Sequence, residues 1–335
     1  MSDNSREKVI VSGMRPTGYL HLGHYHGVIE NWTKLQEDSS FAARFFFVAD
    51  WHSLTTGYDN TAQLKDFSHE IIVDWLAFGL DPKQCTLFIQ SQVPEHAELQ
   101  LLLGMITPIA WLERVPSFKD LQNELKGKDL STFGFLGYPL LQTADVAMYH
   151  GTHVPVGQDQ VAHIELSREI VRRFNHIYKQ DILAEPQSLL NNVPKLLGTD
   201  GRKMSKSYNN SIYLKDDTEN TRIKMMGMVT DPARVKRTDA GDPEKCPVFD
   251  FHNIYSSDAE QQEVTKGCTT AGIGCVDCKK ILLKNMDARL TPLREKRAEL
   301  EKDKGYVQDV ISTGNAHAQQ KAKENMRQIR EAVRI

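Results

Sequence analysis

Residues 8–32 read KVIVSGMRPTGYLHLGHYHGVIENW, and this stretch decides how the rest of the chain is interpreted. An apolar run typical of a buried strand comes first, and an amphipathic helix pattern ends the stretch. Between them lie Pro16, Gly18 and Gly23, which interrupt helices, together with His21 and His24. Two imidazoles at the point where a helix begins require a chemical explanation, and the remainder of the sequence supplies one.

Length and composition set the class of protein. The chain has 335 residues, 40% of them hydrophobic, which is enough for a full core and for two domains. A formal net charge of -3 excludes a globally basic nucleic-acid-binding protein. No window holds the roughly 18 uninterrupted apolar residues of a membrane span. The amino-terminal MSDNSREKVIV has neither the apolar region nor the cleavage site of a signal peptide, so we expect a cytoplasmic protein.

Strand and helix patterns alternate through the first half of the chain. Short apolar runs at 8–13, 44–50 and 86–91 are separated by helical patterns, and a further helix at 161–178 follows the run HVPVG. This alternation predicts an α/β fold with a Rossmann-like, doubly wound parallel sheet. After about residue 210 the strand signals stop. We therefore expect a catalytic domain at 1–212 and an all-helical domain at 213–335, whose charge runs are solvated helix faces.

The stretch that joins the first strand to the first helix lies where open α/β sheets bind nucleotides. A helix amino terminus offers free N–H groups to phosphate, and Gly23 allows a close approach to the backbone. His21 and His24 are three residues apart, so both rings can face the same phosphate. A capped helix with incidental histidines is the alternative, and it would be preferred for a lone HxxH.

A second motif favours the phosphate-binding interpretation of the two histidines. In DGRKMSKSYNN (200–210), Lys203 and Lys206 concentrate positive charge in a polar loop, which suits a pyrophosphate as its charge develops in a transition state. Such a loop alone is usually a solvated turn. Together with HLGH after the first strand, it resembles the HIGH and KMSKS signatures of class I aminoacyl-tRNA synthetases. VADWHSLTT, FIQSQVPEHAEL, GYPLLQTADV and VPVGQDQVAHIELSREIVRRFN further resemble bacterial tryptophanyl-tRNA synthetases.

The resemblance implies a role for each matching residue of the amino-acid pocket. Asp145 matches the acceptor of the indole N–H; indole is a donor only, and a pocket built around this bond rejects phenylalanine. A helix-capping aspartate is the structural alternative. Gln160 matches a residue near the substrate ammonium group, and His52 one near the substrate. Gln142 and Thr143 stand where methionine and alanine are more usual, which adds polar character and keeps tyrosyl-tRNA synthetase as an alternative.

The resemblance also implies an ATP site and a two-step reaction. Asp159 would hold the ribose, His21 and His24 the α- and β-phosphates, and Lys203 and Lys206 the departing pyrophosphate, with Mg²⁺ bridging the phosphates. Lys119 matches a position near the phosphates. The full set of matching ATP positions is Arg15, Pro16, Thr17, Gly23, His24, Gly157, Gln158, Asp159, Val193, Lys203, Met204, Ser205, Lys206 and Ser207.

In the implied reaction, the tryptophan carboxylate attacks the α-phosphorus of ATP, and a terminal ribose hydroxyl of tRNA(Trp) then takes the aminoacyl group. No covalent enzyme intermediate is required, so catalysis is positioning and charge stabilisation. The resemblance also implies a homodimer. A non-catalytic RNA-binding relative and a small-molecule adenylyl transferase remain as alternatives. Intact HLGH, KMSKS, Asp145 and GQDQ argue against the first. The second would share HxGH, but it should lack KMSKS and the long helical carboxyl-terminal half.

Four of the five cysteines lie in the last third of the chain. Cys246, Cys268, Cys275 and Cys278 read C-x21-C-x6-C-x2-C, which in a reducing compartment indicates a metal more than disulfides. Zinc sites more often show two close pairs, whereas Cys₄ ligation of an iron–sulfur cluster allows a single close pair. The remaining alternative is that the cysteines are buried and inert and bind no metal. A subgroup of tryptophanyl-tRNA synthetases carries a [4Fe–4S] cluster on nearly this spacing, so we favour the cluster over zinc, fixing a tRNA-binding surface near Lys279 and Lys280.

Overall fold

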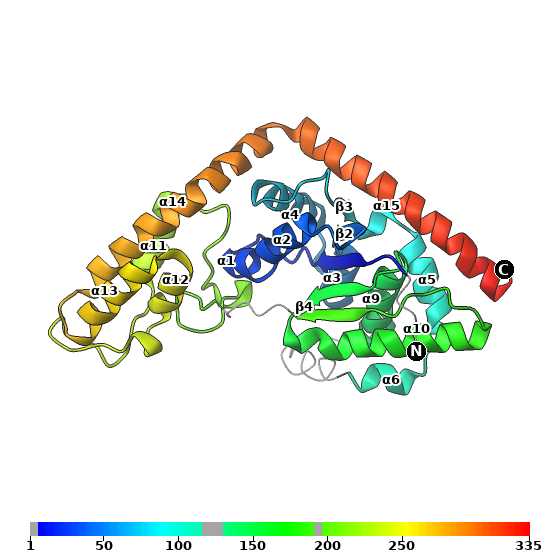
Figure 1. The fold of residues 1–335 in the computed structure, drawn as a ribbon, viewed down its shortest axis with the longest axis horizontal. Helices are drawn as coiled ribbons and strands as arrows, with labels where there is room; N and C mark the ends of the chain where they lie inside the picture. Colours follow the sequence, from blue (N-terminus) through cyan, green and yellow to red (C-terminus); the bar gives the residue numbers. More distant parts are fainter. Residues whose placement is uncertain (1–5, 116–129, 191–195) are drawn as a thin grey trace.

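A five-stranded parallel sheet forms the centre of the molecule (Figure 1). The computed structural model describes residues 6–115, 130–190 and 196–335. The strand order is β3-β2-β1-β4-β5, so the chain moves outward from β1 in one direction and then in the other. The strands are β1 Val9–Met14, β2 Ala43–Val48, β3 Thr86–Ile89, β4 His153–Val156 and β5 Gln187–Leu190. This is the doubly wound sheet that the alternation predicted, with one strand, β5, that the prediction missed.

Helices cover both faces of the sheet and make up the carboxyl-terminal part of the chain (Figure 1). The α-helices are α1 Leu22–His24, α2 Glu30–Glu37, α3 Asp50–Gly57, α4 Leu64–Ala77, α5 Glu95–Gly104, α6 Ile109–Glu113, α8 Phe133–Leu136, α9 Tyr138–Ala147, α10 Val161–Tyr178, α11 Thr218–Gly227, α12 Pro247–Tyr255, α13 Asp258–Thr269, α14 Cys275–Lys302 and α15 Lys304–Val333. No helix within the described ranges is both long and apolar enough to cross a membrane.

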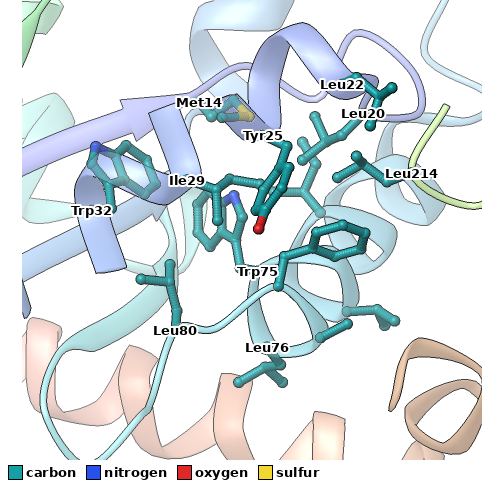
Figure 2. Packing of buried hydrophobic residues seen from close by; sticks show 14 of the residues in the cluster. Met14, Leu20, Leu22, Tyr25, Ile29, Trp32, Trp75, Leu76, Leu80 and Leu214 are labelled. Carbon is teal, nitrogen blue, oxygen red and sulfur yellow. The ribbon is translucent and has the colours of Figure 1, made fainter. Parts of the chain in front are cut away.

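Strand β2 shows why the sheet is buried on both faces. Phe46 points into one hydrophobic cluster with α2 and α4, whereas its neighbours Phe45 and Phe47 point into another with α5, α9 and α10. Successive side chains of a strand face opposite sides, so a run of three phenylalanines requires helices on both. Trp32 of α2 stacks on Phe46 at 4.3 Å and meets the edge of Trp75 of α4, as Figure 2 shows for the two tryptophans.

The amphipathic helix after β1 forms, but it is not regular. Its first turn, α1, is followed by a π-helical turn at Tyr25–Ile29 before the α-helical α2 begins. Single π-turns are frequent at functional sites, because the extra residue re-aims the side chains around it. Here the turn follows directly after the HLGH motif.

The carboxyl-terminal helices form an arm and then return to the sheet (Figure 1). The long helix α14 runs from the cluster of α11–α13 towards α4, and α15 runs back along β3 and α5. Arg297 of α14 is 3% exposed and donates to the buried Asp74 carboxylate of α4 at 2.6 Å. The charge run around Arg297 is therefore not entirely a solvated face, as the sequence had led us to expect.

Candidate active site

The first and second motifs meet at the carboxyl end of β1. Lys206 donates from Nζ to the carbonyl oxygen of Gly18 at 2.8 Å and reaches the hydroxyl of Thr17 at 3.4 Å. Gly18 has φ +130°, a conformation that glycine adopts without strain, and this turn presents its carbonyl to the lysine. Burial lowers the pKa of Lys206 to about 8. The loop at residues 200–210 (the lysine loop) therefore lies against the turn around Gly18 (the glycine turn).

His21 and His24 lie together beside this lysine. Their ring centroids are 3.8 Å apart, as the three-residue spacing predicted. Burial, reinforced by the charge of Lys206, lowers the pKa of His21 to about 4. Burial and the neighbouring His21 lower the pKa of His24 well below its ordinary value. Both rings are therefore neutral at pH 7, and they can offer phosphate hydrogen bonds instead of full positive charges.

The proton of His24 can be placed from its contacts. The backbone N–H of His21 donates to Nδ1 of His24 at 3.2 Å, so in the neutral ring the proton is on Nε2. That leaves Nε2–H as the donor available to a ligand. Nδ1 of His21 is buried without a hydrogen-bond partner among the described residues.

The lysine loop itself is held by one asparagine. The side chain of Asn210 accepts from the backbone N–H of Ser205 at 2.8 Å and donates to Asp200 and to the carbonyl of Lys203. Met204 is buried in the core, whereas Lys203 and Ser207 are exposed. The loop thus has one anchored apolar residue and two accessible polar ones. Arg15 pairs with the hydroxyl of Thr56, and Pro16 is buried next to it in the glycine turn.

Three expected ATP residues and the expected ammonium-binding Gln160 follow β4, the neighbour of β1 in the sheet. Gly157, Gln158, Asp159 and Gln160 form its end and a short 3₁₀ turn, so they lie at the point where the strand order reverses. The amide of Gln160 donates to the carboxylate of Asp159 at 3.0 Å. A Cβ on Gly157 would come within 2.7 Å of the same carboxylate, so a side chain here would require Asp159 to move. Val193 and Lys119 lie outside the described residues.

Asp145 forms the second centre of the site, and it is only 1% exposed. Its Oδ1 accepts hydrogen bonds from Gln90 at 2.7 Å and from Nδ1 of His96 at 2.6 Å. Its Oδ2 accepts one from Nε2 of His52 at 2.9 Å. Burial alone raises the pKa of Asp145, but the hydrogen bonds from His52 and His96 outweigh that effect and hold the pKa at about 2. The side chain is an ionised buried acceptor, and it is not a helix cap.

The two polar replacements near Asp145 have different surroundings. Gln142 is half-buried on α9, three residues before Asp145 and therefore on the same face of the helix. Thr143 is completely buried, and its hydroxyl bonds to the carbonyl of Pro139 and the hydroxyl of Ser167 on α10. The expectation that Thr143 makes the pocket polar is wrong, because its hydroxyl is already satisfied on the α10 side.

With this geometry in place, comparison with known proteins becomes informative. Residues 3–291 match the family of tRNA synthetases class I (W and Y). The chain belongs to this class I synthetase family. It is 51% identical to the tryptophan–tRNA ligase of Thermotoga maritima over 327 residues, covering 97% of this chain and 99% of that protein. The corresponding enzyme of Aquifex aeolicus is 43% identical over 396 residues, with 97% and 99% covered.

A solved structure supports the same assignment. The crystal structure of tryptophanyl-tRNA synthetase from Campylobacter jejuni complexed with ADP and tryptophan is 31% identical. It superposes with a TM-score of 0.87, covering 98% of this synthetase and all of that chain. The predicted fold class, a parallel sheet with a helical carboxyl-terminal part, is confirmed.

The four cysteines of the synthetase lie at the far end of the arm. Cys246 precedes α12, Cys268 lies on α13, and Cys275 and Cys278 form the first turn of α14. Burial, together with the smaller effect of the other three cysteines, raises the pKa of the Cys278 thiol to about 12. Among the described residues, no group of three or more His, Cys, Asp or Glu side chains is placed to hold a metal ion.

The expectation that Lys279 presents a surface to tRNA is wrong. Lys279 is 5% exposed, and its Nζ donates to the carbonyl oxygens of Met226 and Met228. It lies on the inner face of α14, where it joins the helix to the end of α11. Lys280 points outward and pairs with Asp277 at 3.3 Å.

Three residues that surround Asp145 were not assigned from the sequence. Gln90 and His96 contact Asp145, and Tyr149 contacts His96 at 2.8 Å. Gln90 directly follows β3 at the carboxyl edge of the sheet, and His96 begins the next helix. Polar side chains at that edge are the signal that could have identified them.

Proposed function

We propose that this synthetase is a tryptophan–tRNA ligase that uses ATP. In its first reaction the tryptophan carboxylate attacks the α-phosphorus of ATP, which enters with Mg²⁺, and pyrophosphate leaves. In the second, a terminal ribose hydroxyl of tRNA(Trp) attacks the adenylate carbonyl and AMP leaves. This reaction would take place in the cytoplasm. The observation that carries the proposal is Asp145, an ionised and buried acceptor suited to a ring N–H.

Each group near the glycine turn has a part in the first reaction. The neutral His24 would donate from Nε2 to a phosphate oxygen, and His21 would lie beside it on the same face. Lys206 would leave the carbonyl of Gly18 for the pyrophosphate as charge builds up on it. Lys203, exposed at the start of the loop, would follow it. Asp159 and Gln160 would hold the ribose and the substrate ammonium group from the β4 side.

Charging of tRNA tests the whole assignment. The purified chain should attach radiolabelled tryptophan to tRNA in the presence of ATP and Mg²⁺. Attachment of tyrosine instead would make it a tyrosyl-tRNA synthetase, and attachment of no amino acid would favour a non-catalytic RNA-binding relative.

We further propose that the four cysteines hold a [4Fe–4S] cluster. Four cysteine side chains close enough to influence one another electrostatically form a suitable donor set once they lose their protons, and a cationic group complements the charge of such a centre. Arg234 supplies that cationic group and donates to Sγ of Cys268 at 3.8 Å. The ring of His252, whose pKa is lowered by burial, lies 3.3 Å from Sγ of Cys278. Cys246, Cys268, Cys275 and Cys278 would be the ligands, and the cluster would have a structural role in the arm.

Metal analysis separates the readings of this motif. Anaerobically purified protein should be brown, with about four irons and four sulfides per chain. Cys275→Ser should remove the colour and leave tryptophan activation largely intact. One zinc per chain in colourless protein would replace the cluster with a zinc site, and absence of any metal would leave inert cysteines.

A homodimer is also proposed, through apolar side chains that the single chain leaves exposed. Leu101, Met105, Ile109 and Phe133 of α5, α6 and α8 and their connections are 59%, 71%, 62% and 80% exposed. Exposed apolar side chains of this size are typical of protein interfaces. Light scattering should give twice the chain mass, and Met105→Glu with Phe133→Glu should reduce it to one chain.

A further inference from the structure

Behind the amino-acid pocket, three buried polar side chains form a row. Asp145 of α9 accepts from Nδ1 of His96 of α5 at 2.6 Å, and Nε2 of His96 meets the hydroxyl of Tyr149 at 2.8 Å. The three side chains are 1%, 0% and 1% exposed. Water does not reach them, so their hydrogen-bonding groups must satisfy one another.

The chemistry of the groups assigns their protons. Asp145 is ionised and can only accept, so Nδ1 of His96 carries a hydrogen. Among the described residues, Nε2 of His96 is the hydrogen-bond partner of the Tyr149 hydroxyl. A neutral His96 with its lone pair on Nε2 accepts this hydroxyl and leaves every group satisfied. A charged His96 would carry a hydrogen on both nitrogens and would leave the Tyr149 hydrogen without that acceptor.

The hydrogen bonds to Asp145 determine which of its two oxygens can accept a further hydrogen bond. Oδ1 already accepts from both His96 and Gln90, which is the usual capacity of one carboxylate oxygen. In the described part of the chain, Oδ2 accepts only from His52, whose side chain is 12% exposed and is thus the most accessible partner of the carboxylate. The remaining acceptor direction is therefore on Oδ2, on the side of the carboxylate that His52 approaches.

We propose that His96 and Tyr149 are positioning residues that hold Oδ2 of Asp145 towards the pocket and so determine specificity for a side chain with a ring N–H. The inference deepens the proposed function and rests on it. Without the Tyr149 hydroxyl, Asp145 still holds the hydrogen of His96 on Nδ1, but the lone pair on Nε2 is left buried without a donor. The His96 ring then loses the contact that fixes its orientation, and the carboxylate that it holds turns away from its oriented position.

The fold allows the hydroxyl to be removed alone. The ring of Tyr149 stacks on Phe45 at 4.3 Å and meets the edge of Phe88 at 5.5 Å. Tyr149→Phe keeps both ring contacts and removes only the hydrogen bond. Tyr178→Phe is a matched control, because Tyr178 packs on Phe174 at the far end of α10.

The test compares tryptophan with an analogue whose ring sulfur replaces the N–H, benzothienylalanine. In ATP–pyrophosphate exchange, the wild type should prefer tryptophan by orders of magnitude in kcat/KM. Tyr149→Phe should raise KM for tryptophan roughly tenfold, with KM for the analogue unchanged, because only tryptophan donates to Oδ2. His96→Leu should lose the preference, and His96→Asn, whose amide can donate from near the Nδ1 position, should restore most of it. Tyr178→Phe should behave as the wild type.

The outcomes separate the inference from the function on which it rests. Equal losses for tryptophan and the analogue in Tyr149→Phe would mean that the pair is merely structural, and an unchanged preference would mean that it does not orient Asp145. Either result overturns the inference while the ligase assignment stands. A wild type that does not activate tryptophan would overturn the proposed function itself.

Discussion

Lys206 is held by a carbonyl and a hydroxyl oxygen, and the described residues place no carboxylate in contact with it. Burial therefore lowers its pKa to about 8, and the charge of Asp74, which is not in contact with the lysine, only partly opposes that fall. The protonated form, present below that pKa, is the one that can stabilise a departing pyrophosphate. The charge of this residue is thus poised near neutral pH in the unliganded protein.

Activation of ATP should therefore weaken in mild alkali. We predict that kcat/KM for ATP, which reports groups of the free enzyme, falls as the pH rises through about 8. Lys206→Arg should remove this fall, and Lys206→Met should be about a hundredfold slower below pH 8, with the difference from the wild type shrinking as the pH rises. Lys34→Met, on the exposed face of α2, should leave the profile unchanged. A wild-type profile that is flat to pH 9.5 would contradict the role given to Lys206.

Asp145 should stabilise the fold in a pH-dependent way. Its folded pKa of about 2 lies below the ordinary value of 3.8, so the stabilisation is present above pH 4 and is lost as the pH falls towards 2. The shift corresponds to about 2 kcal/mol. Urea unfolding should show Asp145→Asn less stable than the wild type at pH 6, with the difference shrinking below pH 4. A difference that is constant across this range would mean that the carboxylate charge is not what His52 and His96 stabilise.

At the scale of elements, α15 closes the open edge of the sheet at β3. Asn315 of α15 accepts from the backbone N–H of Ile89 at 2.9 Å, and Gly314 lies directly against the backbone of Leu87. An exposed edge strand is a site for unwanted pairing, and a helix packed on it removes that risk. The close approach is possible only because Gly314 has no Cβ.

Gly314→Ala should therefore destabilise the molecule. A Cβ at this position would lie 1.8 Å from the carbonyl oxygen of Leu87, so α15 must move away from β3. We expect a loss of about 2–3 kcal/mol in the free energy of unfolding, as for other overpacked sites. Gly305→Ala in the first turn of the same helix meets only Asp303 at 3.5 Å and should be neutral or slightly stabilising. Equal stability of the two variants would show that α15 does not pack as described.

The sequence predicted those elements whose hydrophobic period is strong. The helix expected at 161–178 has those limits in the structure, and the four expected strands are present. Strand β5 was missed because its QSLL is short, partly exposed and has no apolar run. The π-turn at Tyr25–Ile29 has no periodic signal of its own. Packing partners such as α15 and β3 are far apart in sequence, so no local pattern could pair them.

The site divides in the same way. Motifs located Asp145, His24 and Lys206, because each belongs to a short stretch with a fixed chemical role. The partners that set their charge, such as His96 and Tyr149, come from other elements and become visible only once the chain is folded. Lys279 shows the reverse case: a lysine in a charged run was expected outside, and backbone carbonyls hold it inside.

At the scale of the whole molecule, a buried ion pair joins the arm to the catalytic half. Arg297 of α14 contacts Asp74 and Glu70 of α4 and Glu301 of its own helix. Burial raises the pKa of Asp74 to about 7, and the charge of Arg297 opposes that rise. The negative charge of Asp74 in this buried position thus depends on the presence of Arg297.

Arg297→Met should destabilise the chain by about 3–5 kcal/mol, because it leaves Asp74 buried without its cation. The double variant Arg297→Met with Asp74→Asn should recover much of this loss, since neither charge is then buried alone. Chemical denaturation of the single and double variants measures the coupling. A double variant no more stable than Arg297→Met would show that the ion pair is not what joins α14 to α4.

Exchange of pyrophosphate into ATP, measured with each of the amino acids in turn, tests the central claim most directly. The reaction needs only the site formed by the glycine turn, the lysine loop and the pocket of Asp145, and it reports adenylate formation without tRNA. The account predicts rapid exchange with tryptophan, far slower exchange with tyrosine, and a strong loss of tryptophan use in Asp145→Ala. Preference for tyrosine, or tryptophan-dependent exchange that is unchanged in Asp145→Ala, would contradict it.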